Sequence, residues 1–238
     1  LSDPCHELSV PEQGTVLLWF QTFEFPYRTG QYEKDPEAFI KVDFTRDVGV
    51  FPDPITKEED DDVFLIKVLL DKGIDIIHLR KHESNINYCR FLLNNLTQSE
   101  HMRIVIHDYP ELYDEYSLMG IHLNKNITSL PDDYNGVKTR SCHSIEEIQQ
   151  YKAECDYLFL SPIFDSISKN GYKSRFSHDD LTKASADGII DHKVIALGGI
   201  TFDSIDYLKR LNFGGVAMIG GIYNKKCLND LNDINRYR

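Results

Sequence analysis

The sequence has little that would tie it to a membrane, a nucleic acid or the secretory pathway. No apolar run in its 238 residues is long enough to span a bilayer. Acidic residues exceed basic ones by 38 to 26, which gives a formal net charge of −12. A surface this acidic argues against broad binding to nucleic acid or to anionic membranes. Because no basic segment followed by an apolar one stands near the start, we expect no signal peptide and a cytoplasmic protein.

The five cysteines do not form a pattern that indicates disulfides or a zinc site. They are scattered and odd in number, and no two of them form a C-x-x-C pair. A reducing compartment is therefore expected. The composition is otherwise that of an ordinary globular protein.

From residue 48 onward, short apolar runs alternate with segments of helical periodicity. Such alternation predicts a parallel sheet that is covered by helices. A closed eightfold barrel and an open doubly wound sheet both fit this pattern. The small size of the repeating unit and the lack of a G-x-G-x-x-G motif after the first strand favour the barrel. The expected strands are 48–51, 74–79, 103–107, 119–123, 137–142, 156–160, 193–197 and 214–219.

The first 47 residues do not share this rhythm. Their aromatic residues lie among prolines and glycines without a helical period, although Val16–Phe20 could form a strand. We expect residues 1–47 to be an N-terminal extension of irregular or β structure, with an unassigned role. Residues 48–238 are then the barrel domain.

Two apolar runs end in paired glycines, Gly198-Gly199 and Gly220-Gly221. A buried strand that ends in glycines brings bare backbone N–H groups to the rim of a sheet, where they can bind a phosphate. The alternative is that the glycines only allow tight turns to close. Two such turns at the ends of consecutive strands favour a phosphate site at the mouth of the barrel.

Polar residues lie at the carboxyl ends of most of the other predicted strands. Arg80 can bind a phosphate or be a solvated arginine, and Asp108 can hold Mg²⁺ or cap a helix. His143 can act as a general acid and base or simply be hydrogen-bonded to the backbone. In a barrel these positions converge on one mouth. The other polar residues of this kind are His82, His107, His122, Asn124, Ser141 and Ser161, with Ser166, Ser168 and Lys169 in the loop after the sixth strand.

From about Val48 to Asn224, the order of these motifs resembles the thiamine phosphate synthase/TenI family. The resemblance implies a (β/α)8 TIM barrel, an α/β fold. It rests on the segments His78-Leu-Arg-Lys-His82, Ile106-His-Asp-Tyr109, Gly120-Ile-His-Leu123, Ser141-Cys-His-Ser144, Ser161-Pro-Ile-Phe-Asp-Ser-Ile-Ser-Lys169 and Ala196-Leu-Gly-Gly-Ile200.

The resemblance also implies roles for individual residues. Asp108 matches a Mg²⁺ ligand of the family, but the second metal aspartate is Ile127 here. His78 and His107 stand where the family has glutamine and asparagine. The implied pyrophosphate and pyrimidine contacts are His78, Arg80, His82, His107, Ser141 and Lys169. The implied thiazole-phosphate contacts are Ser166, Ser168, Gly198, Gly199, Ile219 and Gly220.

Three functions remain open at this point. The first is a synthase that joins hydroxymethylpyrimidine pyrophosphate to a thiazole phosphate and uses Mg²⁺. The second is a TenI-type thiazole tautomerase in which His143 is the acid and base. The third is a non-catalytic barrel that binds thiazole phosphate or thiamine phosphate. All three imply a small-molecule partner, and the oligomeric state is left open.

Overall fold

Eight parallel strands close into a barrel. The computed structural model describes residues 15–21, 59–80, 85–165 and 173–218 of the chain. Each strand pairs with its neighbours in chain order, and the first strand also pairs with the last, which confirms the predicted closed barrel. The strands are β1 (Thr15–Gln21), β2 (Ile76–Arg80), β3 (Ile104–Ile106), β4 (Gly120–Leu123), β5 (Val137–Cys142), β6 (Tyr157–Leu160), β7 (Val194–Leu197) and β8 (Gly215–Met218).

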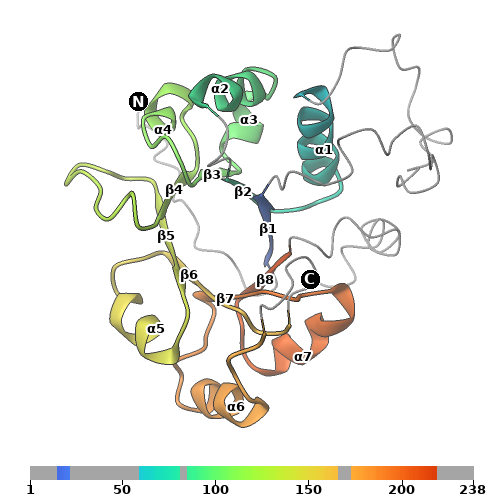
Figure 1. Ribbon diagram of the computed structural model, residues 1–238, viewed down its shortest axis with the longest axis vertical. Coiled ribbons are helices and arrows are strands. Elements are labelled where there is room, and N and C mark those ends of the chain that lie inside the picture. Colours follow the sequence, from blue (N-terminus) through green and yellow to red (C-terminus); the bar gives the residue numbers. More distant parts are fainter. Residues whose placement is uncertain (1–14, 22–58, 81–84, 166–172, 219–238) are drawn as a thin grey trace, which may run out of the picture.

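Helices surround the barrel on its outer side (Figure 1). They follow the strands in the alternation that the sequence predicts, because each amphipathic helix buries its apolar side against the outer face of the sheet. The helices are α1 (Glu59–Asp71), α2 (Ile86–Asn94), α3 (Gln98–His101), α4 (Leu112–Tyr116), α5 (Ile145–Tyr151), α6 (His178–Ala186) and α7 (Ile205–Arg210), with a short 3₁₀ helix, η2 (Phe202–Ser204), before α7.

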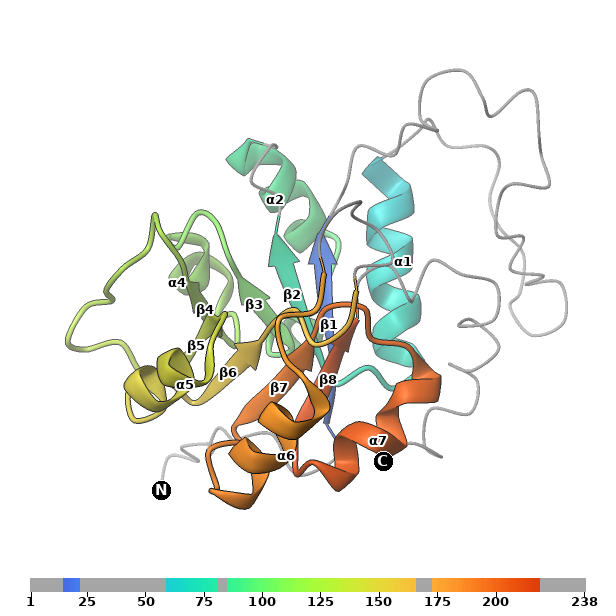
Figure 2. The same ribbon diagram turned by 60° about the horizontal axis from the view of Figure 1, so that its bottom comes forward.

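Strand β1 lies within the range that we assigned to the N-terminal extension. Its backbone pairs with β2 and with β8, and Figure 2 shows it between them. The strand expected at Val16–Phe20 is therefore confirmed, but Thr15–Gln21 belongs to the barrel rather than to an extension, because it closes the barrel by hydrogen-bonding both open edges. Residues 22–75 separate β1 from β2. Because this interval is longer than those between the other strands, the regular spacing of strands and helices does not indicate β1. The strand expected at 48–51 lies outside the described residues.

The apolar residues form two layers because successive side chains of a strand point to opposite faces of the sheet. One layer fills the lumen of the barrel and includes Val105, Phe159 and Ile195. The larger layer lies between the sheet and the helices and includes Ile77 and Leu158. Burying a side chain of this size contributes about 1.5–3 kcal/mol, so the two layers supply the main driving force for folding.

Side-chain caps begin several helices. The Ser144 hydroxyl accepts a hydrogen bond of 3.2 Å from the backbone N–H of Glu147 at the start of α5. The Glu147 carboxylate, however, accepts from the N–H of His143 rather than completing a capping box on Ser144. The start of α5 is thereby fixed next to His143. Asn85 caps α2 in the same way, accepting a hydrogen bond from the backbone N–H of Tyr88.

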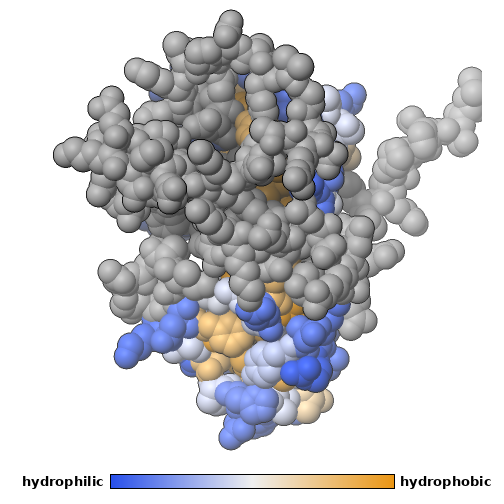
Figure 3. All heavy atoms as spheres, turned by 90° about the vertical axis from the view of Figure 1, so that its right-hand side faces the viewer, coloured by the Kyte–Doolittle hydropathy of each residue, from blue (hydrophilic) through white to orange (hydrophobic). Residues whose placement is uncertain are grey.

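The surface around α7 is mixed in character. In the lower part of Figure 3, hydrophilic residues surround a smaller group of hydrophobic ones. Within the ranges that the structure describes, none of the helices has the length and apolar character that a membrane crossing requires.

Candidate functional site

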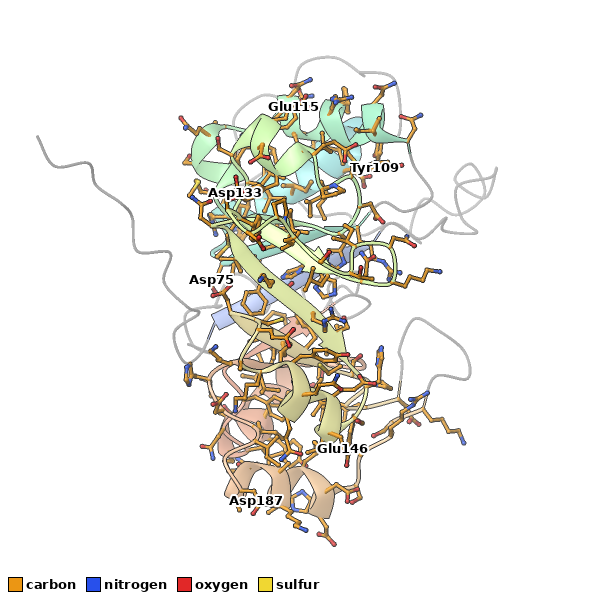
Figure 4. The ribbon with its side chains drawn as sticks, turned by 90° about the vertical axis from the view of Figure 1, so that its left-hand side faces the viewer. Asp75, Tyr109, Glu115, Asp133, Glu146 and Asp187 are labelled. Carbon is orange, nitrogen blue, oxygen red and sulfur yellow. The ribbon has the colours of Figure 1, made fainter. Side chains whose placement is uncertain are left out.

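The carboxyl ends of the strands meet at one end of the barrel, which we call the mouth. In Figure 4, Tyr109 and Glu146, which follow β3 and β5, lie towards the right. Asp75 and Asp133, which precede β2 and β5, lie towards the left. The mouth is therefore on the right of this view, and the side chains that follow the strands converge there, as is usual for sites in such barrels.

The predicted site residues fall into three groups. His78, His107 and Ser141 point into the lumen, whereas Arg80, Asp108, His143, Gly198 and Gly199 lie at the ends of their strands. The remaining predicted residues lie outside the described part of the chain, so that their roles stay predictions. They are His82, Ser166, Ser168, Lys169, Ile219 and Gly220.

Three buried histidines form a hydrogen-bonded cluster in the lumen, just below the mouth. Nδ1 of His78 and Nε2 of His107 share a hydrogen bond of 2.9 Å. The rings of His107 and His122 are stacked, with centroids 4.0 Å apart. We call these three residues the histidine cluster.

Hydroxyl groups from the next two strands hold the outer side of the cluster. Nε2 of His78 lies 2.6 Å from the Tyr157 hydroxyl. The two ring nitrogens of His122 lie 2.7 Å from the hydroxyl of Thr139 and 3.1 Å from that of Ser141. These contacts fix the planes of two of the three imidazoles.

Burial keeps the cluster uncharged. It lowers the pKa of His78 to about 3, because the charged imidazolium would lose its hydration in the lumen. Burial is also the main cause that lowers the pKa values of His107 and His122 well below their usual value, and the charge of Arg80 adds to the effect. All three rings are therefore neutral at neutral pH and can offer nitrogen lone pairs.

Sequence reasoning assigned no role to His122, Thr139 or Tyr157. From the sequence, His122 is only one of several polar residues near strand ends. The sequence does carry one signal for these residues, because side chains two positions apart in a strand lie on the same face of the sheet. His78 and Arg80 share one face of β2 in this way, and Thr139 and Ser141 share one face of β5. The sequence alone does not say that these faces meet, because that depends on the register between β4, β5 and β6.

His143 lies at the end of β5 with an exposed side chain. Its Nδ1 lies 3.0 Å from the backbone carbonyl oxygen of Ser161, at the end of β6. A carbonyl oxygen only accepts, so this shorter contact favours the neutral tautomer with the proton on Nδ1 and a lone pair on Nε2, while the Ser161 hydroxyl lies 3.3 Å from the same Nδ1. The hydrogen bond to the backbone that we considered as an alternative is present, and it also orients the ring for proton transfer.

The glycine turn after β7 requires its glycines. Gly198 and Gly199 have φ values of +96° and +65°, in the left-handed region that other residues avoid. A Cβ on Gly199 would lie 2.3 Å from the carbonyl oxygen of Asp165, and one on Gly198 would lie 2.8 Å from Pro162. The glycines therefore allow the loop after β6 to approach closely. This close approach is enough to explain why glycines stand at both positions, as in the alternative in which they only allow a tight turn to close. Their role in binding a phosphate stays a proposal.

The described residues do not fit a two-carboxylate Mg²⁺ site. Asp108 is half-buried after β3, and it is not the N-cap of α4, because Glu111 occupies that position. Ile127, at the second ligand position implied by the resemblance, is buried in the outer apolar layer. Asn124 shapes this loop instead: its amide nitrogen donates to the carbonyl oxygen of His107, and its side-chain oxygen accepts from the N–H of Ile127.

A family model described as thiamine monophosphate synthase matches residues 53–222. This chain belongs to that family. The resemblance inferred from the motifs is thus confirmed. Among solved structures, a thiamine phosphate pyrophosphorylase from Bacteroides thetaiotaomicron is 34% identical, with a TM-score of 0.65, and the match covers 77% of this chain and 93% of that one.

Curated relatives carry the same family name. A thiamine-phosphate synthase from Marinobacter nauticus is 31% identical over 138 residues, which cover 55% of this chain and 60% of the relative. One from Lactococcus lactis is 25% identical over 177 residues, covering 67% of this chain and 79% of the relative. A thiamine phosphate pyrophosphorylase structure from Pyrococcus furiosus, 17% identical with a TM-score of 0.58, supports the fold alone.

Proposed function

We propose that this member of the thiamine monophosphate synthase family is a transferase that makes thiamine phosphate. In this reaction, a bond from the thiazole nitrogen to the pyrimidine methylene carbon forms, and the bond from that carbon to pyrophosphate breaks. The observation that carries the proposal is the mouth itself, in a barrel that belongs to this family: Arg80 ends β2, Ser141 lies near the end of β5, and the Gly198-Gly199 turn follows β7.

Each of these groups has a task that suits its chemistry. The guanidinium of Arg80 can bind the departing pyrophosphate through two parallel hydrogen bonds and stabilise its growing charge. The backbone N–H groups of the glycine turn suit the phosphate of the thiazole, because they need no cationic side chain. Both tasks are electrostatic, and neither requires a covalent intermediate on the protein.

The proposal does not specify whether the reaction in this protein requires Mg²⁺. The family resemblance implies Mg²⁺, and Asp108 is the described carboxylate in the position that would hold it. Because Ile127 offers no oxygen, we assign no step to the ion, and the assay is designed to run with and without it.

A second function is favoured by one specific observation. His143 has its Nδ1–H bound to the Ser161 carbonyl, which leaves Nε2 to take a proton from a ligand and to return it elsewhere. Thiazole tautomerisation needs such a proton transfer and needs neither pyrophosphate nor Mg²⁺. The apolar side chain at Ile127 is compatible with this chemistry.

The deciding experiment incubates purified protein with hydroxymethylpyrimidine pyrophosphate and thiazole phosphate, with and without Mg²⁺. Formation of thiamine phosphate with an equal amount of pyrophosphate supports the transferase. Arg80→Gln should slow the reaction, whereas Arg90→Gln should not, because Arg90 pairs with Glu115 on the surface.

Other outcomes of the same experiment contradict the transferase. No product at high enzyme concentration, together with isomerisation of the thiazole phosphate precursor, points to the tautomerase. If both assays are silent and thiamine phosphate raises the melting temperature, the barrel is a binding protein.

A further inference from the structure

The histidine cluster has a donor set that differs from the one expected for Mg²⁺. His78, His107 and His122 each offer a ring nitrogen, and these three nitrogens lie within 4.8 Å of one another. All three residues are buried in the lumen. We propose that the cluster is a binding site for a divalent transition-metal ion of the Zn²⁺ or Co²⁺ class, coordinated by three imidazoles. The proposal does not depend on the proposed transferase activity.

The spacing of the nitrogens suits such an ion after small ring movements. A Zn²⁺ ion binds imidazole nitrogens at about 2.0–2.1 Å, so that two ligands of a tetrahedral site lie roughly 3.3 Å apart. Nδ1 of His78 and Nε2 of His107 are 2.9 Å apart. A metal ion between them replaces their hydrogen bond by two coordination bonds. His107 then carries its proton on Nδ1, the tautomer that leaves Nε2 free to coordinate.

The outer contacts of the cluster are those that metal-binding histidines usually have. A ligating histidine generally donates its second ring N–H to a fixed acceptor, which sets the tautomer and orients the ring. The Tyr157 hydroxyl lies 2.6 Å from Nε2 of His78 and can accept a hydrogen bond from the N–H at that nitrogen, leaving Nδ1 for the ion. Both nitrogens of His122 have a hydroxyl within reach, so either one can bind the ion while the other stays hydrogen-bonded.

The chemistry of the donors selects the class of ion. Imidazole nitrogens suit Zn²⁺, Co²⁺ and related ions, whereas Mg²⁺ prefers carboxylate, carbonyl and water oxygens. Three neutral ligands leave the charge of the ion uncompensated, and Arg80 adds positive charge nearby. The fourth ligand is therefore an anion, such as hydroxide or a phosphate oxygen, that enters from the mouth.

Two members of the cluster also provide conservative test variants. His78 and His107 stand where the resembling family has glutamine and asparagine, so His78→Gln and His107→Asn place side chains that suit this type of barrel. Both substitutions remove an imidazole. Neither leaves a large cavity, because the amides have a similar length.

The test uses untagged, chelator-treated full-length protein and Co²⁺ as the probe. We expect one Co²⁺ per chain after dialysis and the intense visible absorption of a tetrahedral nitrogen site. Loss of an outer-shell partner of a metal site typically costs about 10–100-fold in affinity, so Tyr157→Phe should weaken binding by that factor and His107→Asn by more. His192→Gln, an exposed histidine outside the cluster, is the matched control.

A measurement on the unaltered protein makes the result independent of variant folding. In a Zn²⁺ titration followed by ¹⁵N NMR of the histidine rings, the resonances of the three cluster residues should shift while those of His178 and His192 stay in place. Absence of a bound ion, equal Co²⁺ affinity in His107→Asn and the wild type, or shifts confined to surface histidines would overturn the proposal.

Discussion

The imidazole of His143 is bound through Nδ1 to the backbone carbonyl oxygen of Ser161, at 3.0 Å, so that the end of β5 is tied to the end of β6. A second bond, from the N–H of His143 to the Glu147 carboxylate at 2.7 Å, fixes the same residue to the first turn of α5. Both the imidazole ring and the backbone of His143 are thus held in place by hydrogen bonds. This is the arrangement expected of a group that must present one nitrogen in a constant direction.

The bond to Ser161 predicts the tautomer of His143. Because only a protonated Nδ1 can donate to a carbonyl, ¹⁵N NMR at a pH where the ring is neutral should show the proton on Nδ1 and an unprotonated Nε2. If His143 is the acid and base of a tautomerase, His143→Ala should slow isomerisation by about 10²–10⁴-fold and leave thiamine phosphate binding intact. A ring with its proton on Nε2, or an unchanged rate, would contradict this account.

Gly199→Ala should destabilise the protein more than Gly188→Ala. Both glycines have left-handed backbones, with φ values of +65° and +69°, and that conformation costs about 1–2 kcal/mol for alanine. Only at Gly199 would the new methyl group also meet backbone, 2.3 Å from the Asp165 carbonyl oxygen, whereas nothing lies within 4 Å at Gly188. Urea unfolding of the two variants measures the losses of stability. Equal losses would contradict this prediction and would show that the loop after β6 can move away from the new methyl group without a cost in free energy.

The free energy of unfolding should fall as the pH drops below about 6.5. The unfolded chain then protonates His78, whereas the folded protein keeps it neutral because burial holds its pKa at about 3. Stability is therefore present above the unfolded pKa and is lost as the pH falls, by about 1.4 kcal/mol per pH unit for such a group. Urea titrations between pH 7 and pH 5 in the presence of a chelator measure the slope.

The matched variant for this pH effect is His78→Gln, which cannot be protonated. Its stability should depend less steeply on pH than that of the wild type, because His107, His122 and the carboxylates that also contribute in this range are common to both proteins. Identical slopes for the two proteins would mean that His78 is accessible to protons in the folded state.

The thiols of Cys142 and Cys155 should resist alkylation in the folded protein. Burial raises the pKa of Cys142 to about 12 and that of Cys155 to about 11, so almost no thiolate is present at pH 8. Iodoacetamide labelling followed by peptide mass spectrometry should show slow modification of both cysteines without denaturant and rapid modification in urea. Similar rates in the two conditions would indicate that the outer apolar layer opens readily.

Much of the fold could be predicted because its signals are local. Apolar runs of strand length and helical periodicity are visible within a few residues, and the structure confirms most of the expected elements. β1 was assigned to an extension because its partners β2 and β8 are distant in sequence. The boundary of a barrel depends on which strand fills its last gap, and local patterns do not carry that information.

The candidate site also has a part that could be predicted from the sequence and a part that could not. The sequence by itself determined which residues stand at strand ends, including Arg80, Asp108 and His143, because parallel strands place those positions at one mouth. It also determined that Ile127 offers no metal ligand. Only the tertiary structure decided that His78, His107 and His122 meet as neutral rings with hydroxyl partners. The physical reason is that the contacts and pKa values of a buried imidazole depend on strand register and desolvation, which arise only when the barrel closes.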